Sequence, residues 1–306
     1  MRYCCKIYAV AKEEHNGSAG DLNKNLLAAP AHPRTPGIPS MPGFYSTKVK
    51  ILALTESRAD AIRSLARAVE KSHRRRYVAY PREFARSVMT LPGIPSPAPP
   101  LARLIHGGRG GEVRLKLYLL LTLMATDHPY DIRKPPTPNN FARTLDLDPT
   151  TGPRRITSNM KWLADHNFIG LTKRPSATSS IQLLDPQGSG KPMVNPRQHM
   201  KYMSIPLGFW SQGWLLELTP VAIAVLFSLR ERLGGIKEPK YLLPDRRESY
   251  GLSHDTWTRG SRELEDRGLL TVRTITEGED YVYIRRRRTY WLNEDLLDMP
   301  APIGIN

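Results

Sequence analysis

Two stretches of this 306-residue chain place long hydrogen-bond donors along one face of a predicted helix. The first presents Arg154, Thr157, Ser158 and Lys161, with Arg155 alongside. An arginine can bond O6 and N7 of guanine in bidentate fashion, and Thr or Ser hydroxyls bond phosphates or base edges. This pattern favours contact with DNA, and the alternative is the solvent-exposed face of a helix that only packs against the core.

The second stretch repeats the pattern about a hundred residues later. It presents Thr258, Arg259 and Arg262, with His254 at the start of the helix and Asp255 on the same face. These donors could bond bases and phosphates as in the first stretch, although the negative charge of Asp255 would weaken the attraction to DNA. We treat these four donors as further candidate DNA contacts, with a solvated helix face again as the alternative.

Each stretch is followed by a predicted β-hairpin that carries basic residues. Lys173 and Arg174 lead into a small polar turn, which suits phosphate or minor-groove contact. In the second hairpin, Arg285–Arg288 form a run in which neighbours point to opposite faces, so we take Arg285 and Arg287 as candidates. The tip of this hairpin carries Glu277, Glu279 and Asp280, which would be repelled by a phosphate backbone. We therefore expect the first hairpin to contact DNA better than the second. For the second hairpin, a contact with another protein and an ion-paired edge strand remain alternatives.

Motifs for catalysis or metal binding are weak in this sequence. Gly188-Ser-Gly-Lys-Pro192 is similar to a phosphate-binding loop, but it lacks the first Gly and has Pro192 where Ser or Thr is needed. The eight His show no metal-binding spacing, and the two Cys, Cys4 and Cys5, cannot form a four-ligand zinc site. We therefore expect no enzyme activity, no cofactor and no bound metal.

The candidate residues belong to an internal repeat of about 101 residues. In the second copy we expect a buried helix over 215–229, a short helix over 244–250, and a third helix from Ser253 to Gly268. Trp257, Ser261 and Leu264 then face inward, and two strands follow over 269–275 and 281–284. In the first copy the corresponding elements are expected over 113–125, 137–145, 153–166, 168–174 and 179–184. Thr137, Gly152 and Ser253 are the expected N-terminal caps of the helices that follow them. Ile156 aligns with Trp257 and Leu163 with Leu264.

Charge and composition divide the rest of the chain. The net charge is +16, and residues 1–100 carry 16 Lys and Arg against 7 Asp and Glu. A basic protein is attracted to polyanions. A basic amphipathic helix is expected over 56–76, after a Pro- and Gly-rich leader in which Met41 is an alternative start. The predicted division is a disordered leader (1–47), a basic helical segment (48–90), a Pro/Gly-rich linker (91–111), the first repeat (112–186), a linker (187–212), the second repeat (213–295) and a tail (296–306).

Neither a membrane span nor a secretory signal is expected. The longest apolar run, Leu117–Ala125, is far shorter than the roughly 20 residues that a span needs. The first residues lack an apolar stretch followed by a cleavage site. We expect a cytoplasmic, nucleoid-associated protein that has no contact with membranes.

Three helices followed by a two-stranded ribbon describe a winged helix, the helix-turn-helix variant that carries a β-hairpin. Tyr250–Leu270 and the run Arg285–Leu292 resemble segments of bacterial plasmid and phage replication proteins and regulators. Two such copies in tandem are similar to plasmid replication initiators. The resemblance implies an α+β fold, mainly α with small β-hairpins, that binds double-stranded DNA through the third helix and the wing of each copy.

The expected function is sequence-specific binding of double-stranded DNA, in replication initiation of a plasmid or phage-like element. A transcriptional regulator would use the same contacts. A protein–protein adaptor in replication or recombination is the alternative from another class, favoured by the acidic tip of the second hairpin. Replication proteins are then the expected partners, and the sequence leaves homo-oligomerisation open.

Overall fold

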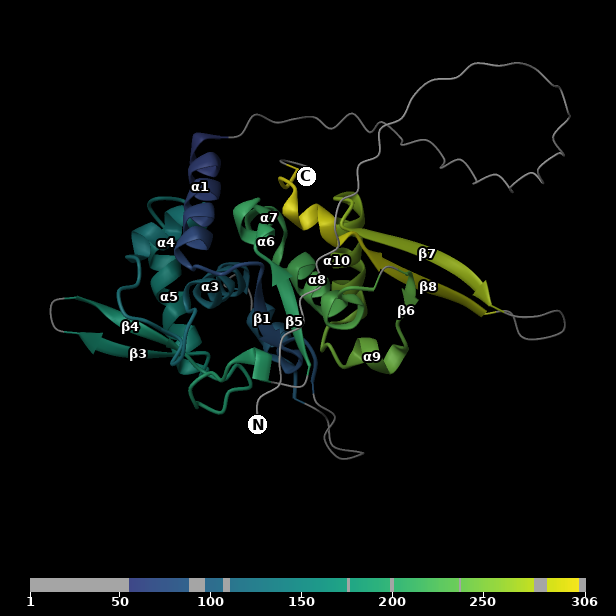
Figure 1. Ribbon diagram of the computed structural model, residues 1–306, viewed down its shortest axis with the longest axis horizontal. Helices are drawn as coiled ribbons and strands as arrows, with labels where there is room; N and C mark the ends of the chain where they lie inside the picture. Colours follow the sequence, from purple (N-terminus) through teal and green to yellow (C-terminus); the bar gives the residue numbers. More distant parts are fainter. Residues whose placement is uncertain are drawn as a thin grey trace, which may run out of the picture. The chain divides into compact units, whose positions relative to one another are not determined.

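The computed structural model describes residues 55–87, 97–106, 111–174, 177–198, 201–236, 238–277 and 285–302. Residues 48–306 form one compact unit. The predicted leader over 1–47 and the predicted strand over 281–284 lie outside the described residues. Within these ranges the fold is α+β, with ten α-helices and three small antiparallel sheets (Figure 1).

The first repeat begins with a helix that is buried on nearly every side and continues with two further helices and a strand pair. Its elements are α3 (Gly111–Met124), β2 (Asp131–Ile132), α4 (Pro138–Thr144), α5 (Gly152–Asp165), β3 (Ile169–Arg174) and β4 (Ala177–Leu183). The strands form an antiparallel sheet in the order β2-β4-β3. The three helices and the strand pair expected in this region are confirmed, and β2 is an addition that the sequence did not reveal.

The second repeat has the same order of elements. They are α8 (Pro220–Leu233), β6 (Lys240–Tyr241), α9 (Pro244–Glu248), α10 (His254–Asp266), β7 (Leu270–Glu277) and β8 (Arg285–Leu292). The sheet order β6-β8-β7 matches that of the first repeat strand for strand. The β3–β4 and β7–β8 hairpins extend away from the helices toward opposite sides in Figure 1.

Side-chain caps fix where several of these helices begin. Thr137 Oγ1 accepts a hydrogen bond from the backbone N–H of Asn140, and Ser253 Oγ accepts one from the backbone N–H of Thr256. Each cap satisfies a backbone N–H that has no partner within its helix. Both residues were expected as caps from the sequence, and both starts are confirmed.

The helix expected over 215–229 is two helices in the structure. α7 (Trp214–Glu217) ends before Thr219, which is extended (φ −66°, ψ 158°), and α8 then starts at Pro220. A proline lacks the N–H that would continue the earlier helix, and its ring disfavours helical geometry in the preceding residue. Thr219 Oγ1 instead caps the new helix by accepting a hydrogen bond from Ala222 N.

The segment before the first repeat packs into the folded unit. The sequence predicted only a basic helical segment over 48–90 and a linker over 91–111. The segment contains α1 (Glu56–Lys71), β1 (Tyr77–Pro81), the short 3-10 helix η1 (Arg82–Phe84) and α2 (Pro100–Ile105). α1 packs against α3, α4 and α6, and Ala61 and Leu65 are fully buried. The physical reason is that the apolar stripe of α1 finds partners on elements far along the chain.

The predicted linker over 187–212 also folds. It contains the 3-10 helix η3 (Pro196–Gln198), β5 (Tyr202–Pro206) and α6 (Gly208–Ser211). β5 pairs with β1 in antiparallel register from Tyr77↔Pro206 to Pro81↔Tyr202. A strand from before the first repeat thus joins one from before the second, and neither strand has a partner nearby in the sequence.

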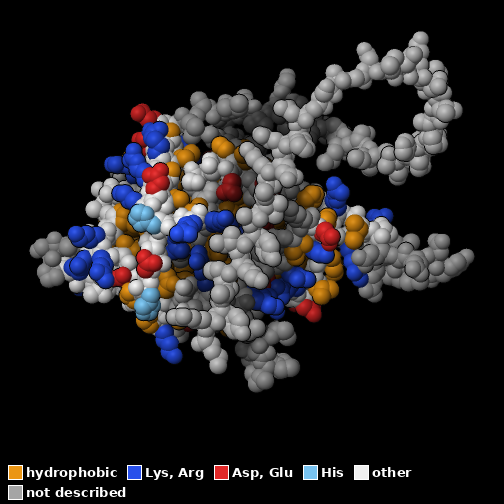
Figure 2. Space-filling model, in the orientation of Figure 1, with side chains coloured by type: hydrophobic (Ala, Val, Ile, Leu, Met, Phe, Trp, Pro, Cys, Tyr) orange, Lys and Arg blue, Asp and Glu red, His pale blue; other side chains and the backbone are white. Residues whose placement is uncertain are grey.

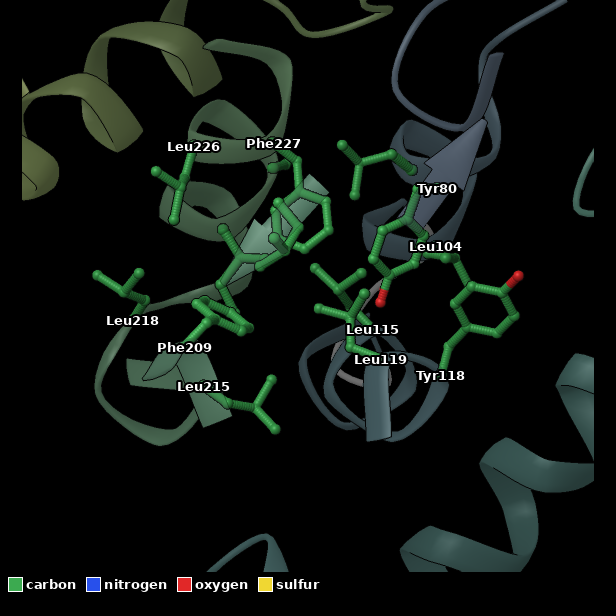
Figure 3. Packing of buried hydrophobic residues seen from close by; sticks show 14 of the residues in the cluster. Tyr80, Leu104, Leu115, Tyr118, Leu119, Phe209, Leu215, Leu218, Leu226 and Phe227 are labelled. Carbon is green, nitrogen blue, oxygen red and sulfur yellow. The ribbon is translucent and has the colours of Figure 1, made fainter. Parts of the chain in front are cut away.

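One hydrophobic core runs through both repeats. Figure 3 shows Tyr80 facing Phe227, with Phe209 on the Phe227 side of this contact and Tyr118 on the Tyr80 side. The rings of Tyr80 and Phe227 are 5.5 Å apart, and all four of these side chains are fully buried. Because β1, α3, α6 and α8 contribute to the same core, the two repeats pack against each other within one folded unit.

The C-terminal segment, expected as a tail, packs against this core as well. The 3-10 helix η4 (Glu294–Asp298) buries Leu297. The Trp214 indole N–H donates to the carbonyls of Leu296 and Met299. Ala301 N donates to Gln212 O, so the chain remains hydrogen-bonded to the α6–α7 region at this point.

Candidate nucleic-acid interface

Helix α5 is held at its start by a carboxylate in the preceding loop. Asp148 Oδ1 accepts hydrogen bonds from Thr151 N (2.8 Å), Thr151 Oγ1 (3.0 Å) and Thr150 N (3.1 Å). The bonds from the Thr151 backbone and hydroxyl lower the pKa of Asp148. Thr151 is the residue before the helix, which starts at Gly152, whereas the sequence placed the cap at Gly152. The first turn of α5 is thereby fixed in direction.

The predicted contact residues of α5 all lie on its exposed face. Ile156 and Leu163 are fully buried on the opposite face. The exposed residues are Arg154, Arg155, Thr157, Ser158 and Lys161. The Lys161 ammonium lies 2.7 Å from the Asp165 carboxylate, with 77% of the lysine side chain exposed. An exposed i,i+4 pair of this kind is weak, so Lys161 remains available to a phosphate.

The C-terminal half of α5 is held against α3 by aromatic contacts that sequence patterns did not reveal. The Arg114 guanidinium lies 3.6 Å from the ring centre of Trp162, and the His166 ring stacks on Trp162 at 3.7 Å. Arg114 also donates to His106 O at 2.8 Å. The consequence is a helix whose exposed face has a fixed orientation.

The β3–β4 hairpin adds basic side chains beside α5. Lys173 and Arg174 are exposed, as predicted, and Arg174 donates a hydrogen bond to the carbonyl oxygen of Arg133. Arg133 follows β2 and has 77% of its side chain exposed, next to Asp131 at 3.1 Å. Figure 2 shows Lys and Arg side chains gathered near the end of this hairpin. The sequence did not single out Arg133 because β2 is only two residues long and leaves no alternating pattern.

Helix α10, like α5, has one buried face and one exposed face, but its net charge differs. Trp257, Ser261 and Leu264 are buried as predicted. His254, Arg259 and Arg262 are exposed, whereas Thr258 is half-buried and its hydroxyl donates to His254 O.

The ion pairing and charge of α10 differ from those of α5. Arg259 pairs with Asp255 at 3.0 Å. Helix α10 carries two arginines against four carboxylates, a net charge of −2. Helix α5 carries three basic residues against one carboxylate, a net charge of +2. On charge alone, α5 is the better partner for a phosphate backbone.

On β8 the structure describes the side chains of Arg286, Arg287 and Arg288, and the predicted contact Arg285 lies outside the described side chains. Arg287 is half-buried and its guanidinium lies 4.9 Å from the ring centre of Tyr241 on β6. Arg286 and Arg288 are exposed, opposite Thr276 and Thr274 of β7. The reason is the pairing of β6 with β8, which covers the Arg287 face and is not visible in the sequence.

Comparison with known proteins finds no match among family models, curated proteins or solved structures. In the described ranges, no helix has both the length and the apolar character of a membrane span. The same part of the chain holds no group of three or more His, Cys, Asp and Glu side chains placed to share a metal ion.

Proposed function

We propose that this chain binds double-stranded DNA through two winged helices, with α5 and α10 as the helices that approach the duplex. The observation that carries the proposal is the shared topology of the repeats. Each has a helix, a short strand, two helices and a strand pair, and the short strand joins the outer side of the last strand. This order of elements supports the assignment of each repeat as a helix-turn-helix with a β-hairpin wing.

In the proposed complex the exposed face of α5 lies in the major groove. Arg154, Arg155, Thr157 and Ser158 occupy its N-terminal half, where a recognition helix contacts base edges. Arg154 and Arg155 have the length and the planar fork to bond guanine in bidentate fashion. Lys161, one turn later, suits a phosphate.

The hairpins supply contacts outside the groove. Lys173, Arg174 and Arg133 are exposed at the β3–β4 end and suit phosphate contacts, which fix the orientation on the duplex without reading sequence. On the second hairpin, the exposed Arg286 and Arg288 suit phosphate contacts, whereas the half-buried Arg287 lies against Tyr241. The chain would then occupy two half-sites, one for each repeat.

The biological role that we propose is replication initiation of a plasmid or phage-like element, in the nucleoid of the cytoplasm and without enzyme activity. A transcriptional regulator would make the same contacts with DNA. The target distinguishes them, because iterated sites in an origin favour initiation and a palindrome beside a promoter favours regulation.

A second candidate for the second repeat is contact with another protein. It rests on the net charge of −2 on α10 and on the Asp255–Arg259 pair, which occupies an arginine on the exposed face. A replication or recombination partner with a basic surface would fit this helix. In that case the first repeat alone would bind DNA.

The test is a binding titration of the Arg154→Ala/Lys161→Ala double variant. After in vitro selection identifies the preferred duplex, fluorescence anisotropy measures affinity for that duplex and for a random one at two salt concentrations. We expect the preference to fall by about tenfold or more, since a bidentate arginine–base contact is worth about 1–3 kcal/mol. The salt slope should decrease by about 1 for the phosphate contact of Lys161.

The control is Arg232→Ala, an exposed arginine in the last turn of α8. It should leave both preference and salt slope unchanged. All variants should unfold within about 0.5 kcal/mol of the wild type, because they alter exposed side chains. A double variant that keeps its full preference would refute the role of α5. Wild-type protein that binds no duplex at low salt would favour the adaptor function.

A further inference from the structure

A basic pocket lies where three distant segments of the chain meet, and none of its lining residues belongs to α5 or α10. Its volume is about 380 Å³. The walls come from residues 72–79 between α1 and β1, residues 122–130 at the end of α3, and residues 183–197 after β4. A pocket of this size falls in the range of roughly 300–1,000 Å³ that small-molecule sites occupy.

The charges that line the pocket are mostly positive. Arg74, Arg75 and Arg197 face a single carboxylate, Asp127, which gives a net charge of +2 with His73 neutral. In the part of the chain that the structure describes, neither Arg75 nor Arg197 forms an ion pair. Like charges gathered around one pocket cost free energy, and that cost is relieved when an anion binds between them.

Arg74 and Arg197 have different tasks in this pocket. Arg74 donates to the carbonyls of Thr122, Leu123 and Ala125 at the end of α3, with distances from 2.7 to 3.2 Å. Burial above all, and also the positive charge of Arg197, lower the pKa of Arg74. Arg74 is therefore a structural residue whose positive charge also faces the pocket.

Arg197 is exposed but held in position. Its backbone N–H donates to Asn195 Oδ1 at 3.0 Å, and its guanidinium lies 5.0 Å from the ring centre of Tyr77. The N–H groups of a guanidinium lie in its own plane, so an arginine on an aromatic face can still bond a phosphate in bidentate fashion. Arg197 is thus prepared for an anionic ligand.

The remaining wall of the pocket is mixed: Ser72, Thr122, Thr126 and Asn195 contribute polar groups, and one part of it is apolar. Val78, Ala79, Leu183 and Met193 line the apolar part, together with the ring of Tyr130. A lone phosphate would leave this apolar wall unused, whereas a phosphate ester with a flat organic group would cover it. His73 (φ 51°) and Tyr130 (φ 60°) also adopt left-handed backbone conformations. Such conformations are unfavourable for these residue types and gather at ligand sites.

We propose that this pocket binds a phosphate monoester of mononucleotide size, with Arg75 and Arg197 on the phosphate and the apolar wall against the organic group. The proposal does not depend on DNA binding by α5 or α10. A small phosphorylated ligand would hold together the three segments that form the walls.

The test is isothermal titration of the full chain with each of the four ribonucleoside monophosphates, the four nucleosides and inorganic phosphate. We expect at least one nucleotide to bind with a 1:1 ratio and to bind more tightly than its nucleoside and than phosphate. Arg197→Ala and Arg75→Ala should each weaken that binding by about tenfold, the effect of a lost hydrogen bond to a charged group. Arg232→Ala, an exposed arginine elsewhere, should leave it unchanged.

Several results would overturn the proposal. They are the absence of saturable nucleotide binding up to about 1 mM, equal binding of phosphate and nucleotide, and full affinity in both arginine variants. Thermal unfolding of each variant checks that it folds. Duplex titrations of the same variants separate the two sites, because loss of DNA affinity without nucleotide binding would assign Arg197 to the DNA surface.

Discussion

Replacing Glu231 tests whether the segment before the first repeat is part of the folded unit. Glu231 lies on α8, and its side chain is fully buried. Its carboxylate accepts hydrogen bonds from Arg82 Nε at 2.6 Å, Arg246 Nη2 at 2.6 Å and the Tyr250 hydroxyl at 3.0 Å. Arg82 belongs to η1 and Arg246 to α9. One carboxylate therefore joins the N-terminal segment to the second repeat.

The expected cost of Glu231→Ala follows from this geometry. Breaking a buried ion pair by removing one partner costs about 3–5 kcal/mol, because the other charge is left without compensation. The side chains of Arg82 and Arg246 are 25% and 19% exposed, so water solvates them in part. We therefore expect about 3 kcal/mol, at the lower end of that range. At about 2–4 °C per kcal/mol, Tm should fall by roughly 6–12 °C.

The effect should also depend on pH. Burial alone would raise the pKa of Glu231, but the hydrogen bonds and charges of Arg82 and Arg246 outweigh it and lower the pKa below the ordinary value of 4.5. A lowered pKa in the folded state means that the stabilisation is present above pH 4.5 and is lost as pH falls through the folded pKa. The Tm difference between wild type and variant should shrink in that acidic range.

The assay is thermal unfolding followed by circular dichroism, at neutral pH and then at decreasing pH. The control is Glu238→Ala, whose side chain is 78% exposed and pairs with Lys240 at 3.1 Å. An exposed pair contributes about 0–1 kcal/mol, so this variant should differ little from the wild type. Equal Tm values for the two variants would refute the role of Glu231, and with it the attachment of η1 to α8.

Two further predictions concern the packing of the repeats. Gly260→Ala should destabilise the protein by about 1–3 kcal/mol in urea unfolding, since a Cβ there would lie 2.6 Å from Val225 Cγ2 and 2.9 Å from Val221 O of α8. Glu265→Ala on the exposed side of α10 is its control, and equal stabilities would contradict this contact. Removal of residues 1–47 should leave the calorimetric transition in place, because 48–306 form one compact unit. Removal of 1–100 should abolish it, since Leu65 and Tyr80 are buried in the core, and a retained transition would show that the N-terminal segment is dispensable.

Local signals account for what the sequence predicted well. The caps Thr137 and Ser253, the inward positions Trp257 and Leu264, and the hairpin of β3 and β4 depend on neighbours within a few residues. The exposed donors of α5 follow from the same helical period. For these elements the sequence alone determined both the type of structure and the side that faces solvent.

The tertiary structure decided what depends on distant partners. β1 and β5 are paired across more than a hundred residues, and the pairing of β6 with β8 places Tyr241 against Arg287. The pocket around Arg197 exists only because three separated segments converge. Pairing between strands and the meeting of loops leave no period in the sequence, since their partners are chosen by the packing of the whole core.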